Sequence, residues 1–290
     1  KINNELVKLP QELQEIVLDK LGAYQHKIEQ LDLELPENND FFESLPKVWG
    51  CSLFVTDSCI RTPSLLHGLI LTGDLFSSDR RNTYVDYLQA CSIDSDKQLA
   101  QQLRQFRNRE MVRIAWRDLA GWSELYETLQ DLTKLAEVCI QFTLDYFYQQ
   151  ACNRRGIPTT DDGTPINIVV LGMGKLGAWE LNYSSDIDLI FAYAEDGVLN
   201  DRKETTYGEF FSRICRNLVK ALDEITVDGF VFRTDIRLRP FGDSGPIIMT
   251  FDGMENYYLT QAREWERYAM IKARQVAGDF DSGKLLAGLI

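Results

Sequence analysis

Residues 166–193 read INIVVLGMGKLGAWELNYSSDIDLIFAY. This stretch decides the fold, because two short apolar runs, Ile166 to Leu171 and Leu189 to Tyr193, lie on either side of a glycine-rich turn. Runs of this length that are rich in β-branched and aromatic residues predict buried strands. Only a short helix fits between them, at about residues 175–182, so the sequence predicts two strands joined by a turn and a short helix.

More strands and helices are expected on the carboxyl-terminal side. Thr206 and Glu209 form a possible capping box. The helix that they open is lined by Phe210, Ile214, Leu218, Leu222 and Ile225. Residues 230–238 are typical of a third strand, and a further helix should begin near Asp252. These elements predict a small mixed sheet flanked by helices.

The amino-terminal side has a different character. Residues 1–155 show helical periodicity, and a polar stretch at 31–48, with Pro36 and Pro46, is expected to be a linker. We therefore predict an α+β protein with a helical region over 1–155 and a core built on the small mixed sheet over 156–290.

The composition is that of a globular protein with an acidic balance. The 290 residues include 44 Asp and Glu against 31 Lys and Arg, which gives a net charge of −13. Broad nucleic-acid binding needs a basic surface and is not expected, although a few basic side chains in a cleft can still bind phosphate. We expect no membrane span, because no run of about 18 apolar residues occurs, and no signal peptide.

Cysteine and histidine usage narrows the chemistry. The six cysteines lack C-x-x-C spacing, which favours reduced thiols in a cytoplasmic protein over disulfides or a zinc site. The two histidines, His26 and His67, lie in segments without a metal-ligand pattern. Histidine-based catalysis and histidine metal sites are therefore not expected.

The sharpest local signal for chemistry is the pair Asp186 and Asp188. Residues i and i+2 of a strand point to the same face, so both carboxylates should project together while Ile187 points into the core. Carboxylates held this close repel each other, and a hard cation such as Mg²⁺ or Mn²⁺ relieves the repulsion. A solvent-facing pair of aspartates at the start of a strand gives the same pattern, so the motif alone leaves both interpretations open.

The expected third strand strengthens the first interpretation. Alternate positions of the strand place a carboxylate among guanidinium groups on one face, which suits a polyphosphate together with a metal. These positions are Arg233, Asp235, Arg237 and Arg239. The alternative is an exposed strand whose charges neutralise one another. If this strand lies beside the aspartate pair, Asp235 supplies a third carboxylate, as in phosphoryl- or nucleotidyl-transfer centres.

The glycine turn G-x-G-x-x-G at 172–177 allows a competing interpretation. It follows a strand and opens a helix, as a dinucleotide-binding fingerprint does, and Glu195 lies at a suitable distance to hold a ribose. However, the connection is short for a βαβ crossover, and the second strand starts with Ser and Asp where a buried parallel strand would be apolar. We disfavour a dinucleotide site, and a P-loop is excluded because Lys175 is not followed by Ser or Thr.

Arginines are concentrated in the long helix expected over 96–119. They are Arg104, Arg107, Arg109, Arg113 and Arg117. We interpret them as a solvated face of the helix in preference to a set of phosphate contacts.

Five motifs, taken together, point to a known family. They are GMGKLG at 172–177, ELNYSSDIDLI at 180–190, FRTDIRLRPFGDSGP at 232–246, WERYA at 265–269 and NREMVRIAWRD at 108–118. Their combination resembles the bifunctional glutamine synthetase adenylyltransferase/adenylyl-removing enzymes, and the resemblance is dense from about residue 104 to 275. It implies a DNA polymerase β-type nucleotidyltransferase fold, which the family carries twice in one long chain.

Small differences separate the two halves of that family. The amino-terminal, adenylyl-removing half typically has S-S-D-I-D-L-I and W-E-R-Y-A, and this sequence has both. The resemblance therefore implies the adenylyl-removing half, truncated before its C-terminal helices and the second catalytic domain. Ala178 and Trp179 depart from the pattern, because the family usually has small residues there.

The candidate site follows from the motifs and the resemblance. Asp186, Asp188 and Asp235 are expected to be catalytic and to bind Mg²⁺ or Mn²⁺. Contacts to nucleotide or phosphate are expected from Gly172, Gly174, Lys175, Ser184, Ser185, Arg237 and Arg239. For the two arginines, ion pairs with neighbouring acids are an equal alternative.

The resemblance implies phosphorolysis of adenylylated glutamine synthetase: inorganic phosphate attacks the adenylyl phosphorus and gives ADP and free tyrosine. The enzyme would be bacterial and cytoplasmic, controlled by the PII signal protein and glutamine, with no nucleic-acid or membrane partner. Phosphate is already an anion, and tyrosinate, with a parent pKa of about 10, is a fair leaving group, so no strong base is required. The alternatives are AMP transfer from ATP to a tyrosine of glutamine synthetase, and a catalytically silent regulatory module.

Overall fold

The computed structural model describes residues 2–34, 37–78 and 81–289. The chain forms two compact units: unit 1 is Lys1–Arg80 with Gln105–Leu132, and unit 2 is Arg81–Arg104 with Thr133–Ile290. The boundaries between the two units thus fall inside two long helices, at residues 104–105 and 132–133. The boundary predicted after residue 155 instead separates a helical region from a region with strands. The predicted division into domains stays a prediction.

The described part of unit 1 is helical. Its elements are α1 (Ile2–Leu6), α2 (Gln11–Gln30), α3 (Asn39–Cys51), α4 (Leu53–Arg61), α5 (Pro63–Leu71), the 3-10 helix η1 (Asp74–Phe76), and parts of α7 (Asp96–Ala120) and α8 (Leu125–Arg155). The helical character predicted for this region is confirmed, and α7 begins and ends within a residue of the expected helix. Of the described helices, none has both the length and the hydrophobicity to cross a membrane.

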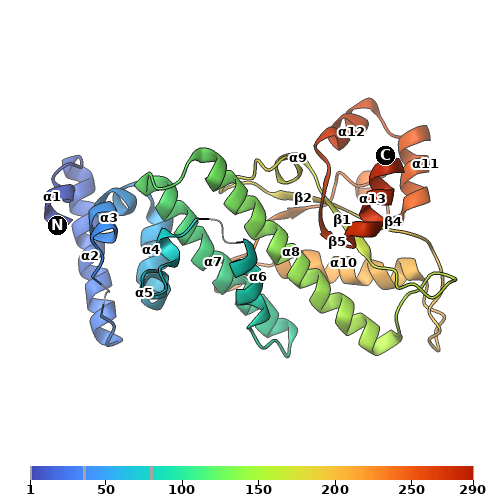
Figure 1. Cartoon of the computed structure of the whole chain (residues 1–290), viewed down its shortest axis with the longest axis horizontal. Helices are drawn as coiled ribbons and strands as arrows, with labels where there is room; N and C mark the ends of the chain where they lie inside the picture. Colours follow the sequence, from blue (N-terminus) through green and yellow to red (C-terminus); the bar gives the residue numbers. More distant parts are fainter. Residues whose placement is uncertain (1, 35–36, 79–80, 290) are drawn as a thin grey trace. The chain divides into compact units, whose positions relative to one another are not determined.

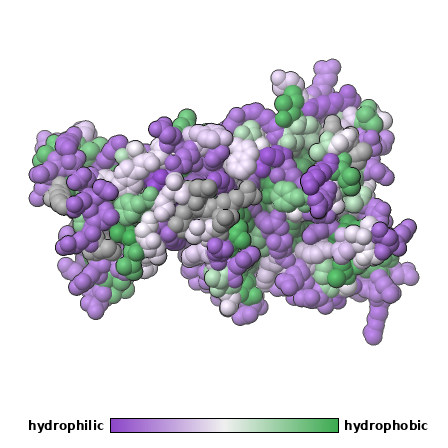
Figure 2. Space-filling view, viewed as in Figure 1, coloured by the Kyte–Doolittle hydropathy of each residue, from purple (hydrophilic) through white to green (hydrophobic). Residues whose placement is uncertain are grey.

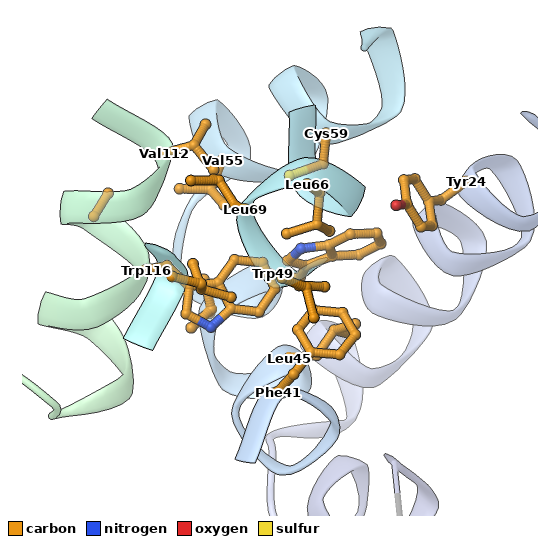
Figure 3. Close-up of a cluster of buried hydrophobic side chains, with 14 of the residues drawn as sticks. Tyr24, Phe41, Leu45, Trp49, Val55, Cys59, Leu66, Leu69, Val112 and Trp116 are labelled. Carbon is orange, nitrogen blue, oxygen red and sulfur yellow. The ribbon is translucent and has the colours of Figure 1, made fainter. Parts of the chain in front are cut away.

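Aromatic and aliphatic side chains together fill the core of unit 1 (Figure 3). Phe41 and Trp116 stack with ring centroids 5.3 Å apart, and Tyr24 meets Trp49 edge to face at 5.5 Å. The Trp116 indole N–H donates to the Ser44 hydroxyl at 2.9 Å, so this buried polar group is satisfied.

The linker expected over residues 31–48 is wrong for the part that forms α3. Asn38 caps this helix by accepting a hydrogen bond from the Phe41 N–H at 2.9 Å. Phe41, Leu45, Val48 and Trp49 are buried along one stripe, and their burial keeps the segment helical although Pro46 lies inside it. Pro36 lies outside the described residues.

The solvated arginine face expected on α7 is also wrong. The exposed fractions of Arg104, Arg113 and Arg117 are 0, 0 and 4%. Within unit 1, Arg113 lies 2.7 Å from Glu110 and 2.6 Å from Asp131, which are buried as well. Charged side chains are stable in an interior only when they are paired in this way, so these arginines are structural.

We expect Arg113→Met to lower the free energy of unfolding of unit 1 by about 3 kcal/mol, because it leaves the Asp131 carboxylate buried without its partner. Urea unfolding followed by tryptophan fluorescence measures this change, because Trp49 and Trp116 report on unit 1. Lys8→Met is the control: its pair with Glu5 is exposed and should contribute less than about 1 kcal/mol. Equal effects of the two variants would contradict this account of α7.

Unit 2 combines helices with the sheet. Its further elements are α6 (Arg81–Gln89), β1 (Ile168–Gly172), α9 (Gly174–Gly177), β2 (Ile187–Tyr193), α10 (Tyr207–Asp223), β3 (Thr234–Asp235), η2 (Gly242–Ser244), β4 (Ile248–Thr250), α11 (Phe251–Thr260), α12 (Glu264–Ala269), η3 (Met270–Lys272), β5 (Arg274–Gly278) and α13 (Phe280–Leu289). This confirms the predicted α+β class, with a small mixed sheet flanked by helices.

The sheet runs in the order β3-β2-β1-β5, with β4 also paired to β2. Figure 1 labels β1, β2, β4 and β5 of this sheet. β1 is antiparallel to β2 and to β5. β3 and β4 are both parallel to β2: β3 pairs with its start, at Ile187 and Asp188, and β4 pairs with its end, from Phe191 to Tyr193. Since β1 and β2 are antiparallel, they form no βαβ crossover, and the dinucleotide interpretation falls.

Helices bury both faces of the sheet. On one face Ile190 and Ala192 of β2 pack with Phe251 and Met254 of α11. On the other face the Tyr193 ring lies 5.0 Å from the Phe211 ring of α10. Asp188 shares the face of Ile190 by alternation, but it lies at the start of the strand, where it is only half-buried. The surface in Figure 2 is mostly hydrophilic, with hydrophobic side chains scattered over it.

Several predicted boundaries need correction. The helix expected over 175–182 is limited to α9, and the strand expected over 230–238 to β3, because the chain turns at Arg237, whose N–H donates to the Asp235 carboxylate at 2.8 Å. α10 begins after its Thr206 cap as expected, but Ile225 lies beyond its end and is 79% exposed. α11 begins at Phe251 and is capped by Thr250.

Candidate active site

Three carboxylates lie where β2 and β3 run side by side. Asp188 and Asp235 are register partners in this parallel pair, and Asp186 directly precedes β2. Register partners on neighbouring strands are about 5 Å apart and point to the same face. The expected third strand is therefore shorter than predicted, but it brings Asp235 beside the aspartate pair as predicted.

Arginines from the β3 segment bind two of these carboxylates. Arg233 Nε lies 2.6 Å from Asp186 Oδ1, and an Nη of Arg233 donates to the Ser184 carbonyl at 2.8 Å. Arg237 Nε donates to Asp235 Oδ2 at 2.8 Å. Both arginines are exposed, so they can exchange these partners for another anion without loss of packing.

The two carboxylates that face each other across the strands differ in acidity. Burial raises the pKa of Asp188, and the charges of Asp235 and Asp186 raise it further. Hydrogen bonds from Arg237 lower the pKa of Asp235. The site therefore pairs one carboxylate whose pKa is raised, by burial and then by like charge, with one whose pKa is lowered.

The donor chemistry and the backbone placement fit a hard divalent cation. Aspartate oxygens suit Mg²⁺ or Mn²⁺, and such a cation offsets both the burial of the Asp188 charge and its repulsion by Asp235 and Asp186, which together raise the Asp188 pKa. Over the described ranges, however, no three acidic, histidine or cysteine side chains converge well enough to hold a metal as they stand. The ion pairs of Asp186 and Asp235 explain this, because each carboxylate is turned towards its arginine.

The glycine turn lies against Asp188. Met173 N–H donates to the Asp188 carbonyl at 2.9 Å. Gly174 has a positive φ of 57°, and a Cβ there would lie 3.6 Å from Asp188 Oδ2. Lys175 is exposed on this turn. Gly172 is explained by packing instead, because a Cβ there would lie 2.6 Å from Val276.

The two predicted serines belong to a turn built around Asn182. The Asn182 carboxamide oxygen accepts from the Ser185 hydroxyl at 2.7 Å and from the Ser184 N–H at 3.3 Å. Ser184 is exposed and Ser185 is half-buried. The turn leads directly into Asp186, so these residues position the first carboxylate.

The structure separates Arg239 from the other two arginines. Its exposed fraction is 8%, and its guanidinium donates to the Ile236 carbonyl at 2.7 Å and lies 3.8 Å from Asp243. The prediction that Arg239 shares one strand face with Arg233, Asp235 and Arg237 is thus wrong, because the chain turns after Asp235. For Arg237 the ion pair with Asp235 is the alternative that is observed.

Sequence reasoning missed Asp223, the last residue of α10. Its carboxylate accepts from the Thr234 N–H at 3.2 Å and so ties α10 to β3. It lines a hollow of about 320 Å³ together with Asp186 and Asp235. A lone Asp at the end of an amphipathic helix gives no signal of this contact, because the partner lies in a different element.

Comparisons with known proteins agree on one family. The family model described as glutamate-ammonia ligase adenylyltransferase matches residues 42–286. Three curated relatives are each named bifunctional glutamine synthetase adenylyltransferase/adenylyl-removing enzyme. Identity is 48% over 98% of this chain for the Nitrosococcus oceani protein, 46% over 85% for that of Methylococcus capsulatus, and 48% over 84% for that of Thioalkalivibrio sulfidiphilus. The matches span 30, 26 and 25% of those proteins.

Proposed function

We propose, since this chain belongs to the glutamate-ammonia ligase adenylyltransferase family, that it is the adenylyl-removing nucleotidyltransferase part of such an enzyme. Its reaction would remove AMP from the adenylylated tyrosine of glutamine synthetase. The names of these relatives contain both the transferring and the removing activity. The motifs S-S-D-I-D-L-I and W-E-R-Y-A support the removing one.

The observation that carries this proposal is the juxtaposition of Asp186, Asp188 and Asp235. An oxygen of inorganic phosphate attacks the adenylyl phosphorus, and the bond from this phosphorus to the tyrosine oxygen breaks. The products are ADP and a tyrosinate, which takes a proton from water. Mg²⁺ or Mn²⁺ bound by the three aspartates would supply Lewis-acid stabilisation of the phosphate charges. Lys175 and Arg237 would orient the phosphates as cations.

The two reactions differ in their need for a proton acceptor. Transfer to a tyrosine hydroxyl needs a group that accepts its proton, whereas phosphate is already an anion and attacks without one. While the ion pair with Arg237 is intact, hydrogen bonds from Arg237 lower the pKa of Asp235, so this carboxylate accepts protons poorly.

The rest of the proposal concerns the setting of the reaction. The resemblance supports a cytoplasmic enzyme that uses phosphate and Mg²⁺ or Mn²⁺ and is regulated by PII and glutamine. ATP would be a ligand of the opposite reaction.

One experiment tests the function directly. The chain is incubated with adenylylated glutamine synthetase and phosphate, and separately with unmodified glutamine synthetase and ATP. We expect ADP and demodified enzyme in the first mixture only. Modification in the second mixture alone would assign the transferase activity instead, and inactivity in both, with the enzyme shown to be folded, would leave a silent regulatory module.

A further inference from the structure

We infer that Arg274 is a positioning residue that fixes the glycine loop, residues 172–177, and that Glu137 anchors it. The inference rests on the proposed function, in which this loop lies against phosphate. Arg274 is the first residue of β5 and lies directly opposite Gly172 in the register of β1 and β5. No step of the proposed reaction uses either Arg274 or Glu137.

The guanidinium of Arg274 binds the end of the loop. Nε donates to the Gly177 carbonyl at 3.0 Å, and an Nη donates to the Leu176 carbonyl at 3.1 Å. Both carbonyls lie at the end of the single turn of α9, where no further helical turn follows. The Leu176 carbonyl also accepts from the Trp179 N–H at 3.4 Å. A planar guanidinium reaches both carbonyls at once, whereas the ammonium of lysine is a point donor.

A buried carboxylate holds the guanidinium in this position. Glu137 Oε1 lies 2.5 Å from Arg274 Nη2, and the Glu137 side chain is 3% exposed. Glu137 belongs to the part of α8 that lies in unit 2. A buried carboxylate is stabilised by a charged partner, so this ion pair ties the arginine to α8, although Glu137 Oε1 makes no hydrogen bond within the described part of the chain.

Close packing leaves the loop little freedom on its other sides. A Cβ at Gly177 would lie only 1.8 Å from the Lys272 carbonyl, so only glycine fits there. Trp179 has φ of 62°, which is uncommon for a bulky residue, and its ring lies 4.1 Å from the Arg274 guanidinium carbon. The arginine therefore holds both the end of the loop and the strained residue after it.

The position of the loop affects Asp188, because the two are in direct contact. Met173 N–H donates to the Asp188 carbonyl at 2.9 Å, and Gly174 lies beside the Asp188 side chain. A loop released at Leu176 and Gly177 would keep the aspartates on their strands but lose the fixed distance between its backbone and Asp188. The expected consequence is weaker phosphate binding with a smaller change in kcat.

The test compares Arg274→Lys and Glu137→Gln with a matched control, Lys272→Gln. The control breaks the Lys272–Glu180 pair, which lies beside the same loop but is half exposed on both sides. Amide hydrogen exchange is measured over residues 173–178, and kcat and the KM for phosphate are measured with adenylylated glutamine synthetase. In the first two variants we expect loop exchange and the KM for phosphate each to rise about tenfold, with the control near wild type.

Two results would overturn the inference. One is loop exchange and a KM for phosphate in Arg274→Lys that equal those of the control. The other is exchange that rises evenly over all of unit 2, which would make the arginine a general stabilising residue. If wild type itself releases no ADP, the proposed function fails, while hydrogen exchange still decides the role of Arg274.

Discussion

Asp188→Asn should lower the rate of phosphorolysis by about 10³-fold or more while the protein stays folded. Asp188 is the carboxylate that faces Asp235 across the strands and lies beside Gly174. Asparagine keeps the size of the side chain but removes the charge that a cation and the reacting phosphates would require. Release of ADP from adenylylated glutamine synthetase measures the loss.

The same substitution should raise thermal stability at neutral pH. Burial and like charges raise the pKa of Asp188 above the ordinary value of an aspartate, about 3.9, so the folded state binds this proton more tightly than the unfolded state does. Below the ordinary value both states are protonated and the residue costs no stability. As the pH rises through the raised pKa of Asp188, ionisation of this carboxylate lowers the free energy of unfolding. The loss is complete above that pKa. The variant should therefore melt higher than wild type at pH 7, and the difference should vanish near pH 3.

Two further variants sharpen this prediction. Asp186→Asn should also abolish turnover, but with near-normal stability, because Asp186 is exposed and pairs only at the surface. Asp281→Asn, which loses a fully exposed carboxylate paired with Lys284, should change neither property. Retained turnover in Asp188→Asn, with the control unchanged, would remove the carboxylates from the mechanism.

Local patterns predicted the parts of the site that local physics controls. Alternation along a strand was sufficient to place Asp186 and Asp188 beside a buried Ile187. Alternation failed after Asp235, because a hydrogen bond from the Arg237 N–H to that carboxylate turns the chain and ends the strand. Such a bond between a side chain and the nearby backbone competes with strand pairing and leaves no trace in hydrophobic periodicity.

Contacts between distant segments were beyond the reach of the sequence. The spacing of the arginines of α7 predicted a solvated face. Arg113 is nevertheless buried, and its guanidinium donates to the carboxylate of Asp131, which lies 18 positions along the chain. Arg274 pairs with Glu137 from another element in the same way. Long-range ion pairs are set by the tertiary fold, so periodicity and charge spacing cannot distinguish them from surface charges.

Asp235→Asn should reduce phosphorolysis by about 10²-fold at low metal concentration, and raised Mg²⁺ or Mn²⁺ should restore much of the loss. Hydrogen bonds from Arg237 keep the Asp235 pKa low, so the carboxylate is ionised throughout the neutral range and is a poor proton acceptor. Its role is then to add negative charge beside Asp188, and a cation held by fewer charges binds more weakly. Titration of activity with Mn²⁺, together with Mn²⁺ occupancy from paramagnetic resonance, measures this shift.

Arg237→Gln separates the carboxylate from its ion pair. It keeps Asp235 but removes the guanidinium that binds it, so the affinity for the metal should be no weaker than in wild type, whatever happens to the KM for phosphate. If instead both variants need more metal than wild type, the loss of the Arg237–Asp235 ion pair explains the effect, and the loss of the Asp235 charge does not. If high metal restores nothing in Asp235→Asn while occupancy is normal, then Asp235 transfers a proton, and the attack by an anion that needs no base is the wrong mechanism for this site.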